Sequence, residues 1–261
     1  MLLIIKIVSK YQIAVTFLAM LLGWFLIAKL GLIGPTLIAS PEEVFNAILD
    51  GFDADAPKSQ RIHIHAIHTI QRALQGWGYS IFFGLSLGFF VGFSRKLYNI
   101  AEPIIEFSRS IPPILIFPLL LVANNYGHSA YTWTIAFGCI PVMTLTVAQG
   151  LSNLNRTRVD LLSVYDVSSL RRVALTSLEM APSIILGARL CLSLAIIIAV
   201  VSEMVFTPRS GFAIGALARD AEIEFNTPVF YSSLLSIGVF GYTTNTLFRK
   251  LEEWFKGKPN S

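Results

Sequence analysis

Charged side chains stand inside long apolar runs of this sequence. Glu106 and Arg109 lie close to Pro112 and Pro113, and Glu203 comes near the end of a later apolar run. A charge within a membrane-spanning segment is costly and marks a solute or ion pathway unless it is paired for packing alone. Proline there frees backbone carbonyls that water or other helices must satisfy. We therefore expect these residues to line a pathway; the alternative is an Arg109–Glu106 pair that serves packing.

Three histidines, His63, His65 and His68, follow the spacing HxHxxH. Such spacing can bind a metal, but no companion cysteine or acidic ligand set accompanies it. No metal site is predicted, and a metal role for the histidines is the alternative. The sequence also has no GxxxxGK[ST], HExxH or GxSxG motif, so neither a catalytic residue nor a cofactor site is expected.

The stretch from Leu154 to Pro182 alternates charged and apolar residues between two long apolar runs. That pattern is typical of short amphipathic helices that lie outside the lipid, and Thr157 to Asp160 resembles a capping box. We expect this loop to contact another protein; an interfacial linker on lipid headgroups is the alternative. The candidate contact residues are Asp160, Leu161, Leu162, Tyr165, Asp166, Arg171 and Arg172.

Composition defines the class of protein. The chain has 261 residues, of which 54% are hydrophobic and 14% charged, and its mean hydropathy is +0.65. Soluble domains carry about 25% charged residues, so an all-α polytopic membrane protein is expected. The basic residues fall between apolar runs, which argues against nucleic-acid binding. The six expected transmembrane helices are Tyr11–Ile33, Thr69–Phe93, Ala101–Ala123, Ser129–Val147, Ser183–Val205 and Pro228–Phe248.

The apolar runs divide the chain into segments. Residues 1–33 form the first segment, 34–67 an extracytoplasmic loop, 68–248 a five-helix core that contains the 154–182 loop, and 249–261 a tail. A short helix is expected to begin at the Ser40-Pro41-Glu42-Glu43 stretch. Gly84, Gly88 and Gly92 recur every fourth residue, which predicts a closely approaching helix. Cys139 and Cys191 are expected to be small buried side chains.

Basic residues between the runs predict the orientation. Those on one side of the expected spans outnumber those on the other, so by the positive-inside rule both termini and the 154–182 loop are cytoplasmic. The larger set is Lys6, Lys10, Arg95, Lys96, Arg156, Arg158, Arg171, Arg172, Arg249, Lys250, Lys256 and Lys258. The smaller set is Lys58, Arg61, Arg209 and Arg219.

With its spans and loops in this order, the chain resembles the permease subunit of a type I ABC importer. The group that it resembles carries nitrate, sulfonate, taurine or bicarbonate. The motifs that carry the resemblance are Thr69-Ile70-Gln71-Arg72, Gly92-Phe93-Ser94-Arg95, Pro103, Arg109-Ser110-Ile111-Pro112-Pro113, Pro118-Leu119 and Ser202-Glu203-Met204. The family's cytoplasmic loop, which begins with Glu-Ala-Ala and ends with a proline followed by a glycine, matches in part. Asp160-Leu161-Leu162 stands at the Glu-Ala-Ala position, and Pro182 and Gly187 stand at the final proline and glycine. Its glycine, both alanines and its first proline are absent, so the loop is a divergent copy.

The resemblance implies partners. In such importers the loop is a coupling helix on a separate ATPase, which binds the ATP and Mg, and an extracytoplasmic binding protein delivers the substrate. It implies a bacterial inner-membrane permease, and the small size of one chain predicts a homodimer. The expected cargo is a small polar or anionic solute. Two alternatives remain, an ion-coupled secondary carrier that uses Glu106, Arg109 and Glu203, and a degenerate permease that acts as a membrane scaffold.

Overall fold

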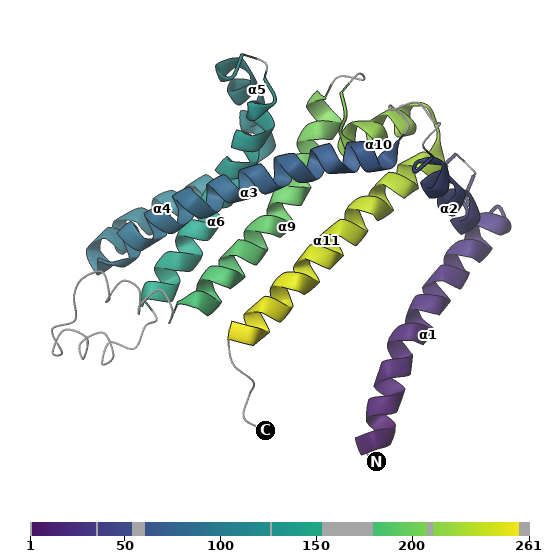
Figure 1. The fold of residues 1–261 in the computed structure, drawn as a ribbon, viewed down its shortest axis with the longest axis horizontal. Helices are drawn as coiled ribbons and strands as arrows, with labels where there is room; N and C mark the ends of the chain where they lie inside the picture. Colours follow the sequence, from purple (N-terminus) through teal and green to yellow (C-terminus); the bar gives the residue numbers. More distant parts are fainter. Residues whose placement is uncertain are drawn as a thin grey trace.

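The computed structural model describes residues 2–34, 36–53, 61–125, 127–152, 180–207 and 211–255, and within these ranges it contains helices and no strand, which confirms the all-helical expectation. Figure 1 shows their order along the chain. The helices are α1 (Leu2–Lys29), α2 (Pro41–Asp50), α3 (Ile62–Gly92), α4 (Arg95–Ser110), α5 (Pro113–Ala123), α6 (Ser129–Ser152), α9 (Ala181–Phe206), α10 (Ile214–Ile223) and α11 (Thr227–Phe255).

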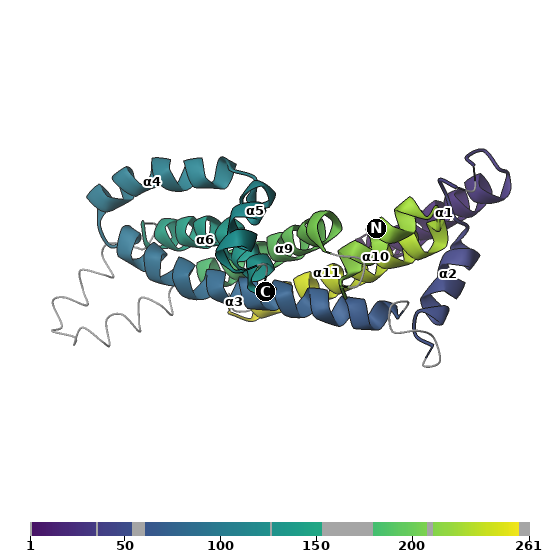
Figure 2. The same cartoon turned by 90° about the horizontal axis from the view of Figure 1, so that it is seen from above.

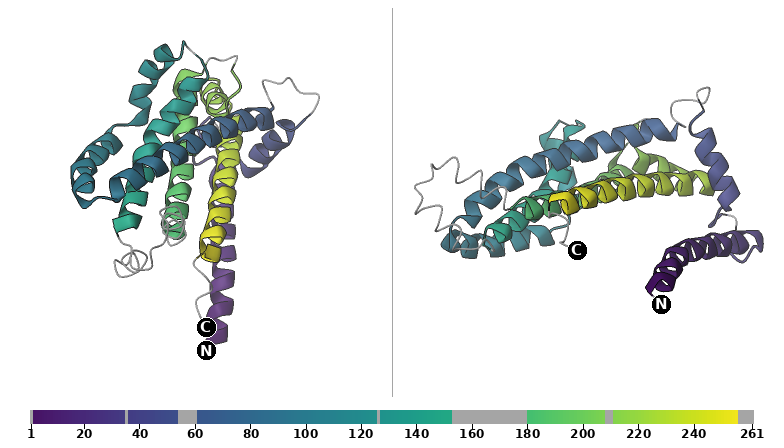
Figure 3. Two further views of the ribbon diagram at one scale, coloured as in Figure 1. Left: turned by 60° about the vertical axis from the view of Figure 1, so that its left-hand side comes forward. Right: turned by 60° about the horizontal axis from the view of Figure 1, so that its bottom comes forward.

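The long helices α3, α6, α9 and α11 form the body of the molecule (Figure 1). The short helices α2 and α10 lie at one end of this bundle. The end of α6, the start of α9 and the end of α11 lie at the opposite end. Most of helix α1 extends away from the bundle (Figure 3), and it meets the bundle at α2 and where Trp24 lies 6.1 Å from Tyr231 of α11 between ring centres. The two segments that flank the 153–179 stretch are therefore neighbours at one end.

Helices α3 and α6 share the most extensive contact, and glycines make it possible. A Cβ atom on Gly84 would lie 2.5 Å from Cβ of Met143, and one on Gly88 would lie 2.6 Å from Cβ of Val147. Real Cβ atoms do not approach so closely, so the two backbones can come together only where the side chain is a hydrogen atom. The predicted close helix approach at this glycine repeat is confirmed.

A continuous apolar core joins α3, α6 and α9 around Ile135, Met143 and Ala195. Cys139 and Cys191 meet inside it: each thiol donates to the carbonyl of the other residue at 3.4 Å. Both side chains are fully buried and free. The prediction of small buried cysteines is confirmed, since paired thiol–carbonyl contacts satisfy both sulfurs within the apolar core.

The third expected span is not one continuous helix, and this corrects the single run Ala101–Ala123. The chain is helical from Arg95 to Ser110 and again from Pro113, and the two helices α4 and α5 are bent by 87°. Ile111 between them is extended, with φ −80° and ψ 117°, because a residue before proline is disfavoured in the α region. Figure 2 shows α4 alongside α6 and the sharp turn into α5.

In the described residues, α3, α6 and α9 are each long and apolar enough to cross a membrane, and α4 with α5 makes a fourth candidate if the bent pair is one span. The chain is thus a polytopic helical membrane protein. The first and last expected spans are helical in α1 and α11; the Ala14–Lys29 part of α1 is an apolar helix, and α11 is not among the candidate spans in the described residues.

The short helix expected at Ser40 is present as α2, with a complete capping box. Oγ of Ser40 accepts from N of Glu43 at 3.3 Å, and N of Ser40 donates to the Glu43 carboxylate at 2.7 Å. Two backbone donors that a helix start would leave unpaired are thereby satisfied. Trp24 ties α1 to this region by donating from Nε1 to the carbonyl of Ala39 at 2.9 Å.

Candidate functional site

A buried carboxylate organises the end of the bundle next to α10. Glu203, near the end of α9, is fully buried. Its Oε1 lies 2.7 Å from Nη1 of Arg72 on α3, and its Oε2 accepts from Oγ1 of Thr69 at 2.7 Å. A buried charge of this kind is tolerated only when it is paired and hydrogen-bonded. The ion pair and the hydroxyl therefore join α3 to α9 at a fixed point.

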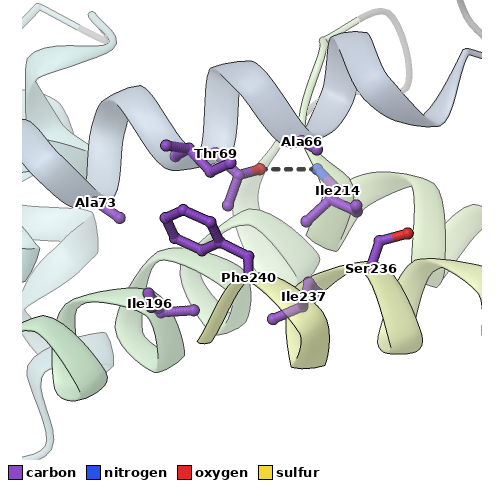
Figure 4. A pocket seen from close by; sticks show the side chains of 9 residues that line it. Ala66, Thr69, Ala73, Ile196, Ile214, Ser236, Ile237 and Phe240 are labelled. Atoms are coloured by element: carbon purple, nitrogen blue, oxygen red, sulfur yellow. Dashed lines mark hydrogen bonds between the residues drawn. The ribbon is translucent and has the colours of Figure 1, made fainter. Parts of the chain in front are cut away.

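The start of α10 completes this cluster. The N–H of Gly215 donates to Oε2 of Glu203 at 3.3 Å, and the N–H of Ile214 donates to Oγ1 of Thr69 at 2.9 Å (Figure 4). These are first-turn N–H groups, which have no partner within their own helix. A Cβ on Gly215 would lie 2.8 Å from Cβ of Glu203, so only glycine brings this backbone so close. The cluster thus binds α10 as well as α3 and α9.

A small apolar hollow lies beneath Thr69, between α3, α9 and α11 (Figure 4). Phe240 and Ile237 of α11 and Ile196 of α9 line it. Its volume is about 40 Å³, and about 10–15 Å³ of such space holds one water molecule. The hollow is therefore a packing gap and not a place for a solute.

Tyr131 of α6 also contacts this cluster. The Arg72 guanidinium lies 4.9 Å from the ring centre of Tyr131, and the Tyr131 hydroxyl is 3.0 Å from Oγ1 of Thr207. Arg219 of α10 donates to the Thr207 carbonyl at 2.7 Å and pairs with Asp220 at 2.7 Å. The Arg72 guanidinium thus contacts a ring face and a carboxylate, and the Arg219 guanidinium contacts a carbonyl and a carboxylate. The arrangement holds four helices and presents no free nucleophile.

The three histidines serve separate contacts. Nδ1 of His65 lies 2.9 Å from the carbonyl oxygen and 3.1 Å from the amide nitrogen of Ala213. His68 stacks on Phe212 at 5.7 Å between ring centres, and Nδ1 of His63 is 3.2 Å from the Gly51 carbonyl. Among the residues that the structure describes, no group of three or more possible ligands is placed to hold a metal ion. Local packing accounts for the HxHxxH spacing here.

A further charged pair lies near the bend between α4 and α5. Nη1 of Arg109 is 2.9 Å from Oε1 of Glu106, and the two side chains are 40% and 52% exposed. Pro112 precedes α5 and Pro113 is its first residue. A Cβ on Gly138 of α6 would lie 2.6 Å from Cγ of Pro113, so the start of α5 packs tightly on α6. The structure gathers these four predicted pathway residues at one bend.

The structure does not bring the predicted site residues together as one set. Glu203 belongs to the buried cluster with Arg72, apart from the bend. The candidate contact residues of the amphipathic loop, Asp160, Leu161, Leu162, Tyr165, Asp166, Arg171 and Arg172, lie outside the described residues. What the structure describes is the base of that loop. There, a Cβ on Gly150 would lie 2.9 Å from Cβ of Ser183, so α6 and α9 touch where the loop leaves them.

Thr69, Arg72 and Tyr131 were not identified as site residues from the sequence. Arg72 and Glu203 are 131 positions apart, so no local pattern connects them. One signal was available: both charges fall in apolar runs, and a charge in such a run calls for a partner of opposite sign. That signal gives the need for a partner but not its identity, because Arg109 and Arg189 also lie in apolar runs.

Comparisons with known proteins agree on one family. Residues 80–257 match the family model for the binding-protein-dependent transport system inner membrane component. A probable ABC transporter permease protein of Brucella melitensis is 24% identical over 89% of this chain and 92% of its own length. The taurine transport system permease protein TauC of Escherichia coli is 21% identical over 92% of this chain and 88% of its own.

Two further proteins complete the comparison. The bicarbonate transport system permease protein CmpB of Synechococcus elongatus is 23% identical over 91% of this chain and 86% of its own. A solved chain of the MetNI methionine ABC transporter, in an inward-facing conformation, superposes with a TM-score of 0.66 at 16% identity and covers 73% of this chain and 94% of that one. Because the family model spans most of the described bundle, this chain belongs to the inner membrane components of binding-protein-dependent ABC transport systems, and it is a transport permease subunit rather than an enzyme.

Proposed function

We propose that this chain forms half of the translocation pathway of an importer for a small polar or anionic solute. The observation that carries the proposal is the Glu106–Arg109 pair, which stays half exposed within the bent pair α4 and α5. Lipid would not solvate these charges, and charged side chains at membrane depth face water-filled cavities or protein. A second copy of the chain, with the pathway between the copies, would cover this face.

The relatives suggest the class of solute. TauC and CmpB are named for taurine and bicarbonate, which are small and carry an anionic group. An arginine recognises such a group through charge-assisted hydrogen bonds. Arg109 has one such bond to Glu106 and remains 40% exposed, so it can also meet a solute. An extracytoplasmic binding protein would deliver that solute.

We infer that the 154–182 loop couples the bundle to a separate ATPase, which binds ATP and Mg. Helices α6 and α9 carry the loop and are packed together at its base and through the apolar core. A push on the loop would therefore move α9 and the elements fixed to Glu203 as a unit. Interfaces that are tightly packed transmit displacement, because they cannot deform continuously.

We also propose that the chain spans the membrane six times, with both termini in the cytoplasm. Helix α11 is less apolar than α3, α6 and α9, but its hydroxyl groups are hydrogen-bonded to carbonyls of the same helix. Ser236 donates to the Ser232 carbonyl at 2.8 Å, and Thr243 donates to the Val239 carbonyl at 2.7 Å. Such internal bonds let a helix with hydroxyl side chains enter an apolar environment. Arg249 and Lys250 lie within α11, near its C-terminal end.

The loop is the place to test the proposal. Replacing Leu161 and Leu162 with Asp should remove the apolar contact with the ATPase, so that ATP hydrolysis continues while uptake into proteoliposomes falls at least tenfold. The experiment purifies the permease through a C-terminal tag with its chromosomal neighbours and measures copurified ATPase, hydrolysis and uptake. A matched control replaces Leu119, an exposed residue of α5, with Ala. Normal uptake in the loop variant would show that coupling runs elsewhere.

A further inference from the structure

A second polar cluster, here called the loop-end cluster, joins α9 to α11 at the end of the bundle that carries the 154–182 loop. Arg189 of α9 donates from Nε to Oδ1 of Asn245 at 2.5 Å, and its Nη1 lies 3.4 Å from Oε2 of Glu252. Both partners belong to α11 and stand about two turns apart. The Glu252 side chain is 11% exposed and that of Arg189 27%, so solvent screens these bonds only in part.

Trp77 of α3 meets the same point. Its Nε1 donates to the carbonyl of Ala188, the residue before Arg189, at 2.8 Å, and its ring packs edge-on against Phe248 of α11 at 5.7 Å between ring centres. Phe248 lies between the two polar partners of Arg189 along α11. The loop-end cluster thus lies where α3, α9 and α11 meet.

The attachment of α11 differs from that of α9. A Cβ on Gly187 of α9 would lie 2.9 Å from Sδ of Met143 and 3.2 Å from Cβ of Thr146, so α9 is packed closely on α6 here. A Cβ on Gly238 or Gly241 of α11 would have nothing within 4 Å, and a gap of about 40 Å³ lies between the middle of α11 and its neighbours α3 and α9. Side-chain bonds therefore carry more of the attachment of α11.

The loop-end cluster lies close to the base of the loop. Helix α9 begins at Ala181, where the loop ends, and Arg189 lies about 12 Å farther along the helix axis. A displacement of the loop thus reaches Arg189 through a short stretch of helix. A guanidinium bonds its partners in fixed directions, so a turn or slide of α9 alone would break the bonds to α11.

The start of α11 is bonded at the opposite end of the bundle. Thr227 donates to the Thr36 carbonyl and Tyr231 to the Leu37 carbonyl, each at 3.1 Å. Both acceptors lie in the segment that leads into α2. A rigid helix carries displacement along its length. A movement that α11 receives at its loop end would therefore reach this segment.

We propose that Arg189 is a positioning residue for transport: its bonds to Asn245 and Glu252 make α11 follow α9 when the 154–182 loop moves. The inference rests on the coupling role proposed for that loop. Without these bonds, α9 would move and α11 would lag behind it. ATP would then be hydrolysed without the full movement of the bundle.

Spin labels on the two helices test the inference in the full-length permease purified with its ATPase, with ATP as the added ligand. The label sites are Ile197→Cys on α9 and Leu247→Cys on α11, which are 59% and 65% exposed, whereas the native cysteines are buried. Double electron–electron resonance measures the distance between the labels. We expect the same distance with and without ATP in the otherwise unaltered chain. In Arg189→Met it should shift by about 2–5 Å on ATP binding, the range of helix displacements at moving interfaces.

Two further variants separate this role from general stability. Asn245→Leu leaves the pair of Arg189 with Glu252 in place and should still give a shift. Arg249→Met is the matched control, because Arg249 pairs with Glu253 on the exposed surface of the same helix, 4.0 Å apart, and it should give none. ATP hydrolysis within about twofold of the unaltered complex shows that each variant is assembled. An unchanged distance in both Arg189→Met and Asn245→Leu, or the same shift in Arg249→Met, would overturn the inference.

The loop substitution distinguishes this inference from the proposed function. Adding Leu161→Asp and Leu162→Asp to Arg189→Met should abolish the shift, because the loop then no longer moves α9. If the loop variant loses uptake but Arg189→Met shows no shift, the positioning role is wrong and the coupling role of the loop stands. If Arg189→Met shifts even with the loop substitutions, Arg189 joins the helices as inferred and coupling through the loop is wrong.

Discussion

At the scale of single residues, the Arg72–Glu203 pair is the feature that the bundle depends on most. Glu203 is fully buried, and the Arg72 side chain is 10% exposed. Forming such a pair costs desolvation of two charges, and its net contribution to stability is small. Breaking it by removing Arg72 is a different matter, because the buried Glu203 carboxylate then has no opposite charge beside it. The hydrogen bonds that Glu203 accepts from Thr69 and Gly215 remain, but they do not neutralise its charge.

Replacing Arg72 with Met should therefore lower the free energy of unfolding by about 3–5 kcal/mol, the usual cost of one orphaned buried charge. Arg109→Met is the matched control, since its pair with Glu106 is half exposed and worth at most about 1 kcal/mol. Thermal unfolding in detergent, followed by tryptophan fluorescence, compares the two. Restoring part of the loss by adding Glu203→Met would confirm the origin of the effect. Equal shifts in Tm for both arginine variants would contradict it.

At the scale of elements, the glycine face of α3 sets the position of α6. Gly76, Gly84, Gly88 and Gly92 all lie where a Cβ would strike α6. Close approach of two helices gains dispersion contacts along their whole length, which is the main source of helix association within lipid. Gly78 in the same helix faces open space, with nothing within 4 Å of a Cβ. Helix α3 thus contains glycines that are packed against α6 and one, Gly78, that is not, and the two kinds can be compared by substitution.

Gly88→Ala should destabilise the bundle by about 1–3 kcal/mol, the range for overpacking. The added carbon would lie 2.6 Å from Cβ of Val147 and 2.8 Å from the Thr144 carbonyl, and a carbonyl cannot swing away as a side chain end can. Gly78→Ala should be neutral or stabilising by up to about 1 kcal/mol through helix propensity. Chemical unfolding in detergent measures both. A Gly88→Ala protein as stable as Gly78→Ala would mean that the helices are further apart than described.

At the scale of the whole molecule, the two ends of the bundle differ in character. The end with α2 and α10 carries the buried polar cluster and the capped helix, whereas the opposite end carries the base of the 154–182 loop and the end of α11 (Figure 1). Arg95 is the first residue of α4, Arg249 lies near the end of α11, and Arg219 lies in α10. The basic residues thus favour a cytoplasmic loop end.

Reporter fusions test this orientation. Green fluorescent protein fused to the C-terminus should fluoresce and alkaline phosphatase fused there should be inactive, because the positive-inside rule holds that end in the cytoplasm. Alkaline phosphatase fused after Asp53, in the segment between α2 and α3, should be active. Activity of the C-terminal phosphatase fusion would contradict the six-span arrangement.

The sequence by itself determined the all-helical class, the membrane class, the short capped helix at Ser40 and the glycine repeat that packs α3 on α6, but not the short helix α10. These follow from apolar runs, capping residues and spacing, which are properties of neighbouring positions. Even the break at Ile111 has a local cause in the two prolines after it, although the run was interpreted as one span.

Only the tertiary structure decided how the charges are used. It paired Glu203 with Arg72 across 131 positions and left Glu106 and Arg109 half exposed at a bend. Sequence shows that a buried charge needs a partner but not which one it takes, because the choice depends on which helices lie side by side. That arrangement is set by the packing of the whole bundle.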